Sequence, residues 1–207
     1  MVLHSLDFTQ ILIAFCVLLV SLTVHEAAHA FTADRLGDRT ARLLGRVSLN
    51  PAVHIDPIGT ILFPLIAIMT NVPVIGWAKP VPVNGRNLRN ERRDFVLVAA
   101  AGPASNLALA AIAAFVWRML PGGADELIAT IVQRALLMNV LLAVFNMIPV
   151  PPLDGGNVLA GLLPIPLARQ YDRLRPWGFL LLYGLMLTGI LGAIVVPPAR
   201  LILSWLL

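Results

Sequence analysis

The chain has 207 residues, of which 58% are hydrophobic and 13% charged, and its mean hydropathy is +0.85. A soluble domain has about half its residues apolar and about a quarter charged, so this composition excludes an ordinary soluble protein and predicts an integral membrane protein. The net charge of +4 fits Lys and Arg gathered in cytoplasmic loops, and no pattern of aromatic and basic residues predicts a nucleic-acid partner. The single cysteine, Cys16, excludes an internal disulfide and a Cys-x-x-Cys metal site.

The first apolar segment covers residues 8–33 and is interrupted only by His25, Glu26 and His29. A helix that crosses a membrane needs about 20 apolar residues. The segment is therefore long enough to cross, provided that its three polar residues have a function there.

Two basic stretches, 34–57 and 77–94, flank an apolar stretch, 58–75, that proline and asparagine interrupt. The positive-inside rule places both basic stretches on the cytoplasmic side. The stretch between them should then not cross the membrane, and we predict a re-entrant or interfacial hairpin there. Alternate prolines in residues 79–83 forbid a helix and predict an extended strand or loop.

Two later segments, 95–117 and 127–148, are also long and apolar enough to cross. Pro121, Gly122 and Gly123 predict a turn between them. Arg134 lies within the second segment, and we expect its side chain to extend toward the outer surface.

A break rich in Pro and Gly follows at 149–156, then a shorter apolar piece at 158–168 and a last long apolar run at 176–199, which ends near a Pro pair. The expected fold class is an all-α polytopic membrane protein with about five to six membrane helices or helical segments. It includes a short extended or re-entrant region at 34–94, and residues 1–207 form a single domain.

The sequence His25-Glu26-Ala27-Ala28-His29 matches the motif H-E-x-x-H. On a helix, residues four apart lie on one face, so both imidazoles can reach one Zn²⁺ at about 2.0–2.1 Å. Glu26 then serves as general base toward a water on the metal. The alternative is a helix that ends before the motif, but the apolar pattern continues past it. Ionisable groups inside a membrane are expensive, which favours a functional site.

A catalytic zinc ion takes three protein ligands and keeps one position for water. Asp154 is the best candidate for the third ligand, because it directly follows an apolar helix within backbone that Pro and Gly make irregular. Such backbone is tolerated at membrane depth only when protein shields it or it lines a water-filled cavity. An ordinary surface turn at Asp154 and Gly155 is the alternative, and spacing alone leaves both open.

Three segments together resemble the site-2 protease family of intramembrane zinc metalloproteases. They are the HEAAH helix, the Ala-Gly-Pro-Ala-Ser-Asn of residues 101–106, and the segment from Asn146 to the Pro-Leu-Asp-Gly-Gly of residues 152–156. They occur in the family's order and span residues 25–156.

The resemblance implies that His25, His29 and Asp154 bind one zinc ion per chain and that Glu26 is the catalytic base. It also implies that Asn106 and Asn146 position the substrate or stabilise the oxyanion. Without the resemblance, either asparagine could simply satisfy a contact between helices.

The resemblance further implies a compact form of the family without a PDZ domain, with the lipid bilayer and transmembrane protein substrates as partners. It leaves the oligomeric state open. His54 and Asp56 lie in a segment, residues 48–59, that looks like a feature of this compact branch. For these two residues a role within the loop is favoured over one in the site.

The expected function is therefore zinc-dependent hydrolysis of peptide bonds in or near membrane-spanning segments, as in regulated intramembrane proteolysis. Two alternatives remain: a metal-ion transporter that uses the same His and Asp residues, and an inactive relative that binds membrane helices. We expect the protein in the cell (inner) membrane of a prokaryote, with the active site toward the cytoplasmic side.

Overall fold

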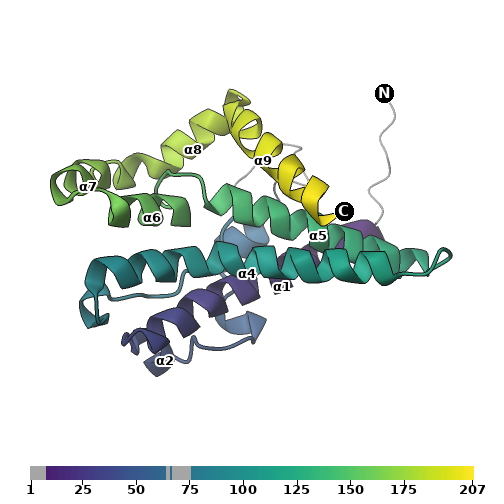
Figure 1. Ribbon diagram of the computed structural model, residues 1–207, viewed down its shortest axis with the longest axis horizontal. Coiled ribbons are helices and arrows are strands. Elements are labelled where there is room, and N and C mark those ends of the chain that lie inside the picture. The colour runs from purple at the N-terminus through teal and green to yellow at the C-terminus, as the bar shows by residue number, and fades with distance from the viewer. Residues whose placement is uncertain (1–7, 64–65, 67–75) are drawn as a thin grey trace.

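The computed structural model describes residues 8–63, 66 and 76–207 (Figure 1), and these residues form helices and connecting segments without a β-strand. Among the described residues, three helices are long and apolar enough to cross a membrane: α1 (Phe8–Arg35), α4 (Glu91–Met119) and α5 (Glu126–Asn146). They match the first three long apolar segments of the sequence. The predicted all-α class is confirmed.

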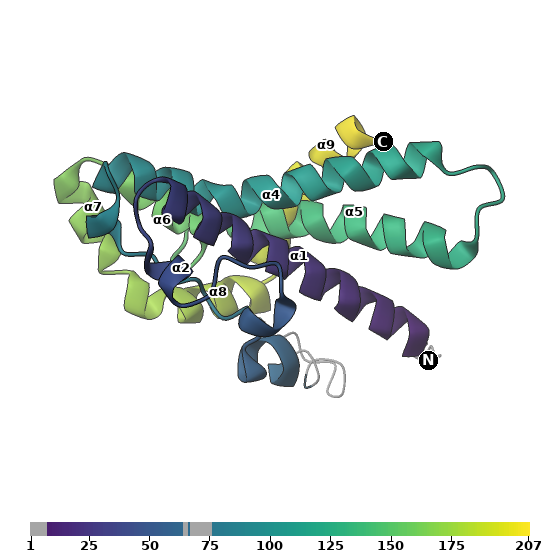
Figure 2. The ribbon, with the colours of Figure 1, turned by 90° about the horizontal axis from the view of Figure 1, so that it is seen from below.

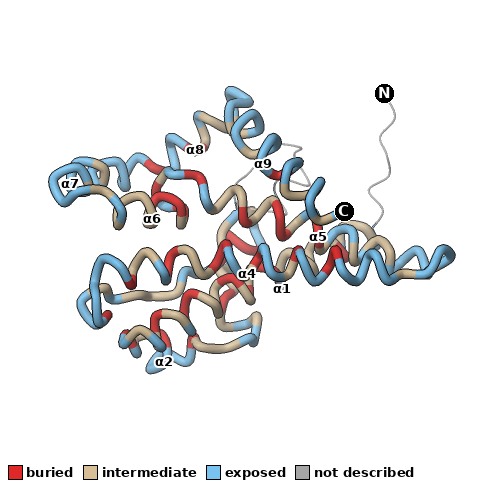
Figure 3. Tube along the Cα trace, viewed as in Figure 1, coloured by how far each residue is buried: buried red, intermediate tan, exposed pale blue. Residues whose placement is uncertain are grey.

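Helix α4 lies at the centre of the molecule, where it packs against α1, α5 and α6 (Asp154–Leu162) (Figure 2). Its face toward α5 carries three buried alanines, Ala110, Ala113 and Ala114. Small residues let helix backbones approach closely inside a membrane, where no hydrophobic effect drives helices together. Buried residues concentrate where these helices meet, and the outer faces are exposed (Figure 3).

Side-chain caps define where the second and third long helices begin. Asn90 accepts a hydrogen bond from the Arg93 N–H at the start of α4 (3.4 Å), and Asp125 accepts one from the Leu127 N–H at the start of α5 (2.8 Å). Both residue types are favoured at helix N-caps, because their oxygens satisfy backbone donors that have no partner within the helix. Asp125 follows the Pro-Gly-Gly turn that the sequence predicts.

The described residues of the basic region include several short helices and an irregular segment at residues 76–84. The helices are α2 (Thr40–Leu43), η1 (Pro51–Val53), η2 (Pro57–Leu62) and η3 (Gly85–Asn87). Asp38 connects the two basic stretches: its carboxylate accepts hydrogen bonds from the Thr40 hydroxyl (2.5 Å), the Asn84 N–H (2.6 Å) and the Asn87 amide (3.0 Å). The irregular backbone at 76–84 agrees with the extended strand or loop that the alternate prolines of residues 79–83 predict.

Most of the hairpin predicted for residues 58–75 cannot be compared with the structure, because residues 64–65 and 67–75 lie outside the described residues. Its two flanks are described, and they meet. The Trp77 N–H donates to the Gly59 carbonyl (3.2 Å), and the Thr60 hydroxyl donates to the Trp77 carbonyl (2.9 Å). The chain therefore enters and leaves this stretch at one place in the molecule.

The C-terminal part is more broken than the sequence predicts. The apolar piece at 158–168 is divided at Pro164 between α6 and α7 (Ile165–Asp172). After the short η4 (Arg175–Trp177), the run at 176–199 is divided between α8 (Gly178–Leu187) and α9 (Ile190–Leu206).

The last apolar run does not form one straight helix. The chain turns instead at Gly189, whose φ of +76° suits a residue without a side chain, and the helices on either side are bent by 81° (Figure 1). Pro197 and Pro198 lie inside α9, which continues to Leu206. Proline already has a helical φ and removes one backbone donor, a loss that transmembrane helices tolerate because neighbouring groups satisfy the freed carbonyl. Counting the bent pair as one span gives up to four candidate spans.

Arg134 has a polar partner. Its guanidinium donates to the Gln10 side-chain carbonyl of α1 (3.3 Å). The side chain therefore connects α5 with the first turn of α1.

Candidate metal centre

His25 and His29 lie on one face of α1, as the four-residue spacing requires, and both are buried. Their Nε2 atoms are 3.1 Å apart. The helix continues to Arg35, so the alternative of a helix that ends before the motif is wrong.

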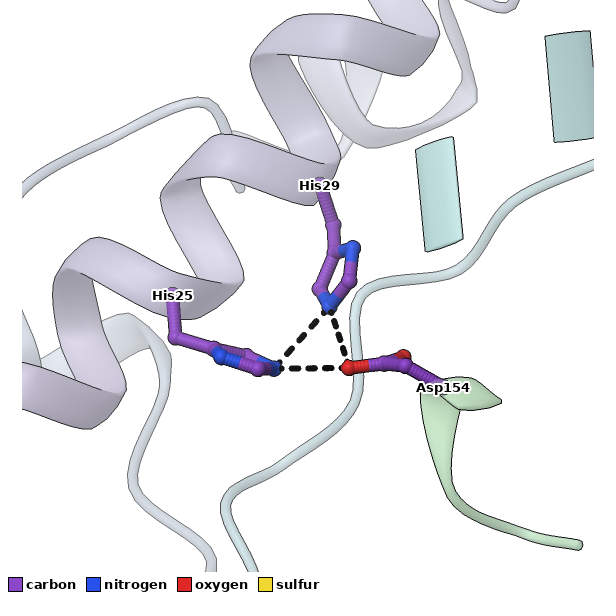
Figure 4. Close-up of side chains that lie close together, drawn as sticks. All are labelled: His25, His29 and Asp154. Carbon is purple, nitrogen blue, oxygen red and sulfur yellow. Dashed lines mark hydrogen bonds and ion pairs between the residues drawn. The ribbon is translucent and has the colours of Figure 1, made fainter. Parts of the chain in front are cut away.

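Asp154 is the first residue of α6 and points at the two histidines (Figure 4). Its Oδ2 atom lies 3.0 Å from Nε2 of His25 and 3.3 Å from Nε2 of His29. The irregular backbone before α6 lets the chain leave α5 and return toward α1. Asp154 is therefore not a surface turn, and its Oδ2 atom is buried without a conventional hydrogen-bond donor.

The opposite ring nitrogens fix the histidines. Nδ1 of His29 lies 2.7 Å from the Val98 carbonyl of α4, and Nδ1 of His25 lies 2.6 Å from Oδ1 of Asn106. A backbone carbonyl can only accept a hydrogen bond, so the proton of His29 is on Nδ1 and Nε2 presents a lone pair. Histidines that ligate metals commonly donate their other N–H in this way.

The three converging atoms fit a zinc ion. Ligands at about 2.0–2.1 Å from a tetrahedral metal lie about 3.3 Å from one another, and the three sides of the observed triangle are 3.0, 3.1 and 3.3 Å. Two lone pairs and a carboxylate at such distances repel one another unless a proton or a metal ion lies between them. Two imidazoles and a carboxylate are a donor set that suits zinc.

Gly102 of α4 provides the space for the ion. A Cβ atom built on this glycine would lie 2.4 Å from Nε2 of His29 and 2.6 Å from Nε2 of His25. Any other residue would bring its Cβ atom against both ligand nitrogens, which would then have to shift. The signal in the sequence is a glycine within an apolar helix, where it costs about 0.5–1 kcal/mol relative to alanine.

Glu26 lines the same cavity as the three converging residues. Its Oε2 atom accepts a hydrogen bond from the Val81 N–H (2.9 Å). Val81 stands between Pro80 and Pro82, which have no N–H. It is thus the one donor that these three backbone positions can offer, and the structure directs it at Glu26. Sequence analysis did not single out this residue.

The cavity has a volume of about 870 Å³ and is lined mostly by apolar side chains around the polar centre. Six aromatic side chains are among its described lining residues, and three of them lie close together. The ring of Trp77 lies 5.0 Å from that of Phe63 and 5.7 Å from that of Phe179, between centroids. These three rings come from the segment before residue 64, from the irregular segment at 76–84 and from α8, so all three segments contribute to the cavity wall.

The two asparagines that the family resemblance singled out lie in different places. Asn146, at the end of α5, lines the cavity and donates to the Leu142 carbonyl of its own helix (3.0 Å). Asn106 is fully buried behind His25, and its amide group also donates to Asn139 (2.8 Å). Contact with a substrate in the cavity is therefore open to Asn146, whereas Asn106 holds a histidine.

His54 and Asp56 have local roles. The Nε2 atom of His54 lies 2.8 Å from the Ser48 carbonyl, and Asp56 caps η2 by accepting from the Ile58 and Gly59 N–H groups (3.0 and 2.8 Å). Neither is among the residues that line the cavity. The structure agrees with the loop role that we favoured.

Residues 122–186 match the model of a family described as Peptidase family M50. The chain is 38% identical over 188 residues to "Putative zinc metalloprotease YwhC" of Bacillus subtilis (strain 168), covering 87% of this chain and 82% of that protein. It is 30% identical over 175 residues to "Putative zinc metalloprotease Rip2" of Mycolicibacterium smegmatis, covering 84% of this chain and 66% of that protein. With Rip2 of Mycobacterium tuberculosis (strain ATCC 25618 / H37Rv) the identity is 33% over 142 residues, which cover 68% of this chain and 53% of that protein. No solved structure matches the chain.

The similarity to YwhC extends over most of both chains and agrees with the convergence of the HEAAH helix and Asp154 on one point. The chain belongs to peptidase family M50, the site-2 protease family of zinc metalloproteases, with His25, His29 and Asp154 as its metal site.

Proposed function

We propose that the protein is an intramembrane endopeptidase that holds one zinc ion and hydrolyses peptide bonds in or near the membrane-spanning segments of other proteins. The observation that carries this proposal is the position of Glu26. Its carboxylate lines the same cavity as three converging metal-ligand atoms, and the HEAAH helix is itself long and apolar enough to cross a membrane.

His25, His29 and Asp154 would hold the ion through Nε2, Nε2 and Oδ2. A zinc ion in such a site supplies Lewis acidity, which polarises a carbonyl group and makes water a nucleophile near neutral pH. Glu26 takes the proton of the attacking water and delivers it to the leaving amine. The Val81 N–H holds Oε2 of Glu26, which leaves Oε1 available to take the proton.

The cavity wall fits an apolar peptide segment, because the polar groups gather at the metal centre and aromatic rings line part of the remainder. A substrate helix must unwind locally before hydrolysis, since its carbonyl groups are otherwise occupied by hydrogen bonds within the helix. Asn146 lines the cavity, and its amide has a second N–H besides the one that bonds Leu142. This N–H is our candidate donor to the developing oxyanion.

We further propose that the site opens toward the cytoplasm of a prokaryotic cell. The metal centre lies toward the C-terminal end of α1, from which the first basic stretch continues. Positive charge near the ends of membrane helices favours the cytoplasmic side.

The test compares the wild-type protein with Glu26→Gln in liposomes, with zinc content and cleavage of a model transmembrane helix measured on the same samples. We expect about one zinc ion per chain in both proteins. The substitution removes the base while keeping the shape of the side chain, and the expected loss in cleavage rate is about 10²–10⁴-fold. Glu126→Gln is the matched control, because Glu126 is exposed at the start of α5 and its loss should leave cleavage unchanged.

Equal cleavage by wild type and Glu26→Gln, or the absence of bound zinc, would refute the proposal. Transport of metal ions through the same site is the competing function. Uptake of zinc into liposomes that persists in Glu26→Gln, without cleavage by either protein, would establish it in place of hydrolysis.

A further inference from the structure

Asn139 is a buried polar residue of α5 that belongs to none of the sequence motifs. Its side chain is 3% exposed and lies in a helix that is long and apolar enough to cross a membrane. A polar group in such a place is expensive unless it is hydrogen-bonded. Both halves of the Asn139 amide are bonded: Nδ2 donates to the Ala135 carbonyl (2.9 Å), and Oδ1 accepts from Nδ2 of Asn106 (2.8 Å).

Asn139, Asn106 and His25 form a series of hydrogen bonds, and the Ala135 carbonyl at one end of the series sets the direction of each bond. The Ala135 carbonyl can only accept, so it selects the NH₂ group of Asn139 and turns Oδ1 toward Asn106. Oδ1 can also only accept, so it selects the NH₂ group of Asn106. A second backbone carbonyl, that of Ser21, lies 3.3 Å from the same Nδ2 atom and favours the same orientation.

The remaining oxygen of Asn106 then meets the metal ligand. Oδ1 of Asn106 lies 2.6 Å from Nδ1 of His25 and requires a proton there. Nε2 of His25 is left with its lone pair, which is the form that binds a metal. A flipped Asn106 amide would present N–H to Nδ1, move the ring proton to Nε2 and remove the ligand.

The two histidines are thus held in different ways. His29 needs no intermediary, because its Nδ1 faces the Val98 carbonyl directly. His25 faces an amide that can present either of two groups, so its tautomer depends on what orients that amide.

We infer that Asn139 is a positioning residue for the metal centre: it orients the Asn106 amide and thereby keeps Nε2 of His25 free to bind the ion. The inference rests on the proposed function only for the identity of the metal. Asn139, Asn106 and His25 thus form one series of hydrogen bonds that connects α5, α4 and α1 and ends at the metal centre.

The test uses Asn139→Leu and Asn139→Asp in the full chain in detergent. Leucine has a similar volume but cannot accept the Asn106 N–H, so we expect zinc to bind about 10–100-fold more weakly, the range for partners that orient metal ligands. In an apolar interior an aspartic acid is held protonated. Its O–H can donate to Ala135 and its carbonyl can accept from Asn106, so Asn139→Asp should restore zinc affinity close to that of the wild type.

Three measurements keep a structural effect apart from a positioning effect. Zinc affinity is obtained by competition with a chelator, the Co²⁺-substituted site is followed by its visible absorption, and ¹⁵N NMR of the metal-free protein reports which nitrogen of His25 carries the proton. Thr23→Val is the control, because the buried Thr23 hydroxyl bonds the Leu19 carbonyl of its own helix (2.7 Å). Thermal unfolding of each variant verifies that it is folded.

The inference is overturned if folded Asn139→Leu binds zinc as the wild type does, if Asn139→Asp fails to restore binding, if Thr23→Val weakens binding equally, or if Nδ1 of His25 carries no proton in the wild type. Failure of the proposed function looks different. A wild-type protein that cleaves nothing, with zinc affinity that still falls in Asn139→Leu and recovers in Asn139→Asp, contradicts peptide hydrolysis and leaves the role of Asn139 intact.

Discussion

Gly102 shows that the absence of a side chain can define a metal site. The residue lies in the middle of α4, where alanine would be the better helix former. A methyl group there would approach both ligand nitrogens to within 2.6 Å, well inside ordinary contact distance. The glycine therefore lets both ligand nitrogens approach α4, at some expense in helix stability.

Gly102→Ala should remove metal binding from a chain that still folds. The added carbon would lie within 2.6 Å of both ligand nitrogens and displace them, so we expect zinc content to fall from about one ion per chain to near zero, as measured by atomic emission on protein in detergent. Gly192→Ala in α9 is the matched control, because a Cβ atom there meets nothing within 4 Å. It should keep its zinc and gain up to about 1 kcal/mol in stability from the better helix former. Zinc retained at the wild-type level in Gly102→Ala would contradict the assignment of the site.

At the scale of single residues, the spacing of the HEAAH motif was sufficient to predict two of the three ligands and the position of Glu26. Asp154 could be proposed but not separated from a surface turn. Asn106 was assigned toward the substrate through the family resemblance, whereas its side chain lies behind His25. Gly102, Val81 and Asn139 were missed, because their importance depends on residues distant in the sequence.

Among the elements, the end of α1 is fastened to the second basic stretch by one carboxylate. Asp38 has no exposed surface and accepts hydrogen bonds from both stretches. Burial raises the pKa of Asp38, but hydrogen bonds from Thr40, Asn87 and Asn84 lower it by more. The pKa of Asp38 therefore lies below its ordinary value of 3.8.

The lowered pKa predicts how stability depends on pH. A carboxyl group whose pKa is lower in the folded state stabilises the fold above its ordinary pKa, and that contribution is lost as the pH falls through the lowered value. The free energy of unfolding should therefore fall in acid by more in the wild type than in Asp38→Asn. At pH 7 the substitution should cost about 1–3 kcal/mol, because it leaves a buried donor without an acceptor. Denaturant titrations in detergent between pH 7 and pH 3 measure both quantities.

Asp125→Asn is the control for this substitution. Asp125 is an exposed N-cap, and Asn caps helices about as well as Asp. Its stability at pH 7 should equal that of the wild type. An acid dependence in Asp38→Asn as steep as that of the wild type would show that other groups cause the effect.

At the scale of the whole molecule, its orientation in the membrane can be tested. Both basic stretches contain exposed positions, among them Leu43 and Arg86, and the turn between α4 and α5 exposes Gly122. If α4 and α5 cross the membrane as a pair, this turn is on the side opposite the basic stretches.

Single cysteines at these positions should therefore label from opposite sides in a Cys16→Ala background. We expect a membrane-impermeant maleimide to modify Leu43→Cys and Arg86→Cys in inverted vesicles, and Gly122→Cys in intact spheroplasts. Labelling of positions 43 and 86 from opposite sides would mean that residues 58–75 cross the membrane, contrary to our prediction. Denatured samples, in which all three react, control for reactivity.

The sequence by itself determined the membrane class, the three long helices and the pair of histidines. These properties depend on composition and on the period of a helix, which act over a few residues. The tertiary structure decided which carboxylate joins the histidines, where Asn106 points, that α8 and α9 turn at Gly189, and that Gly102 and Asn139 serve the centre. Each of these depends on contacts between helices that lie far apart in the chain, and such contacts follow from how side chains pack in three dimensions.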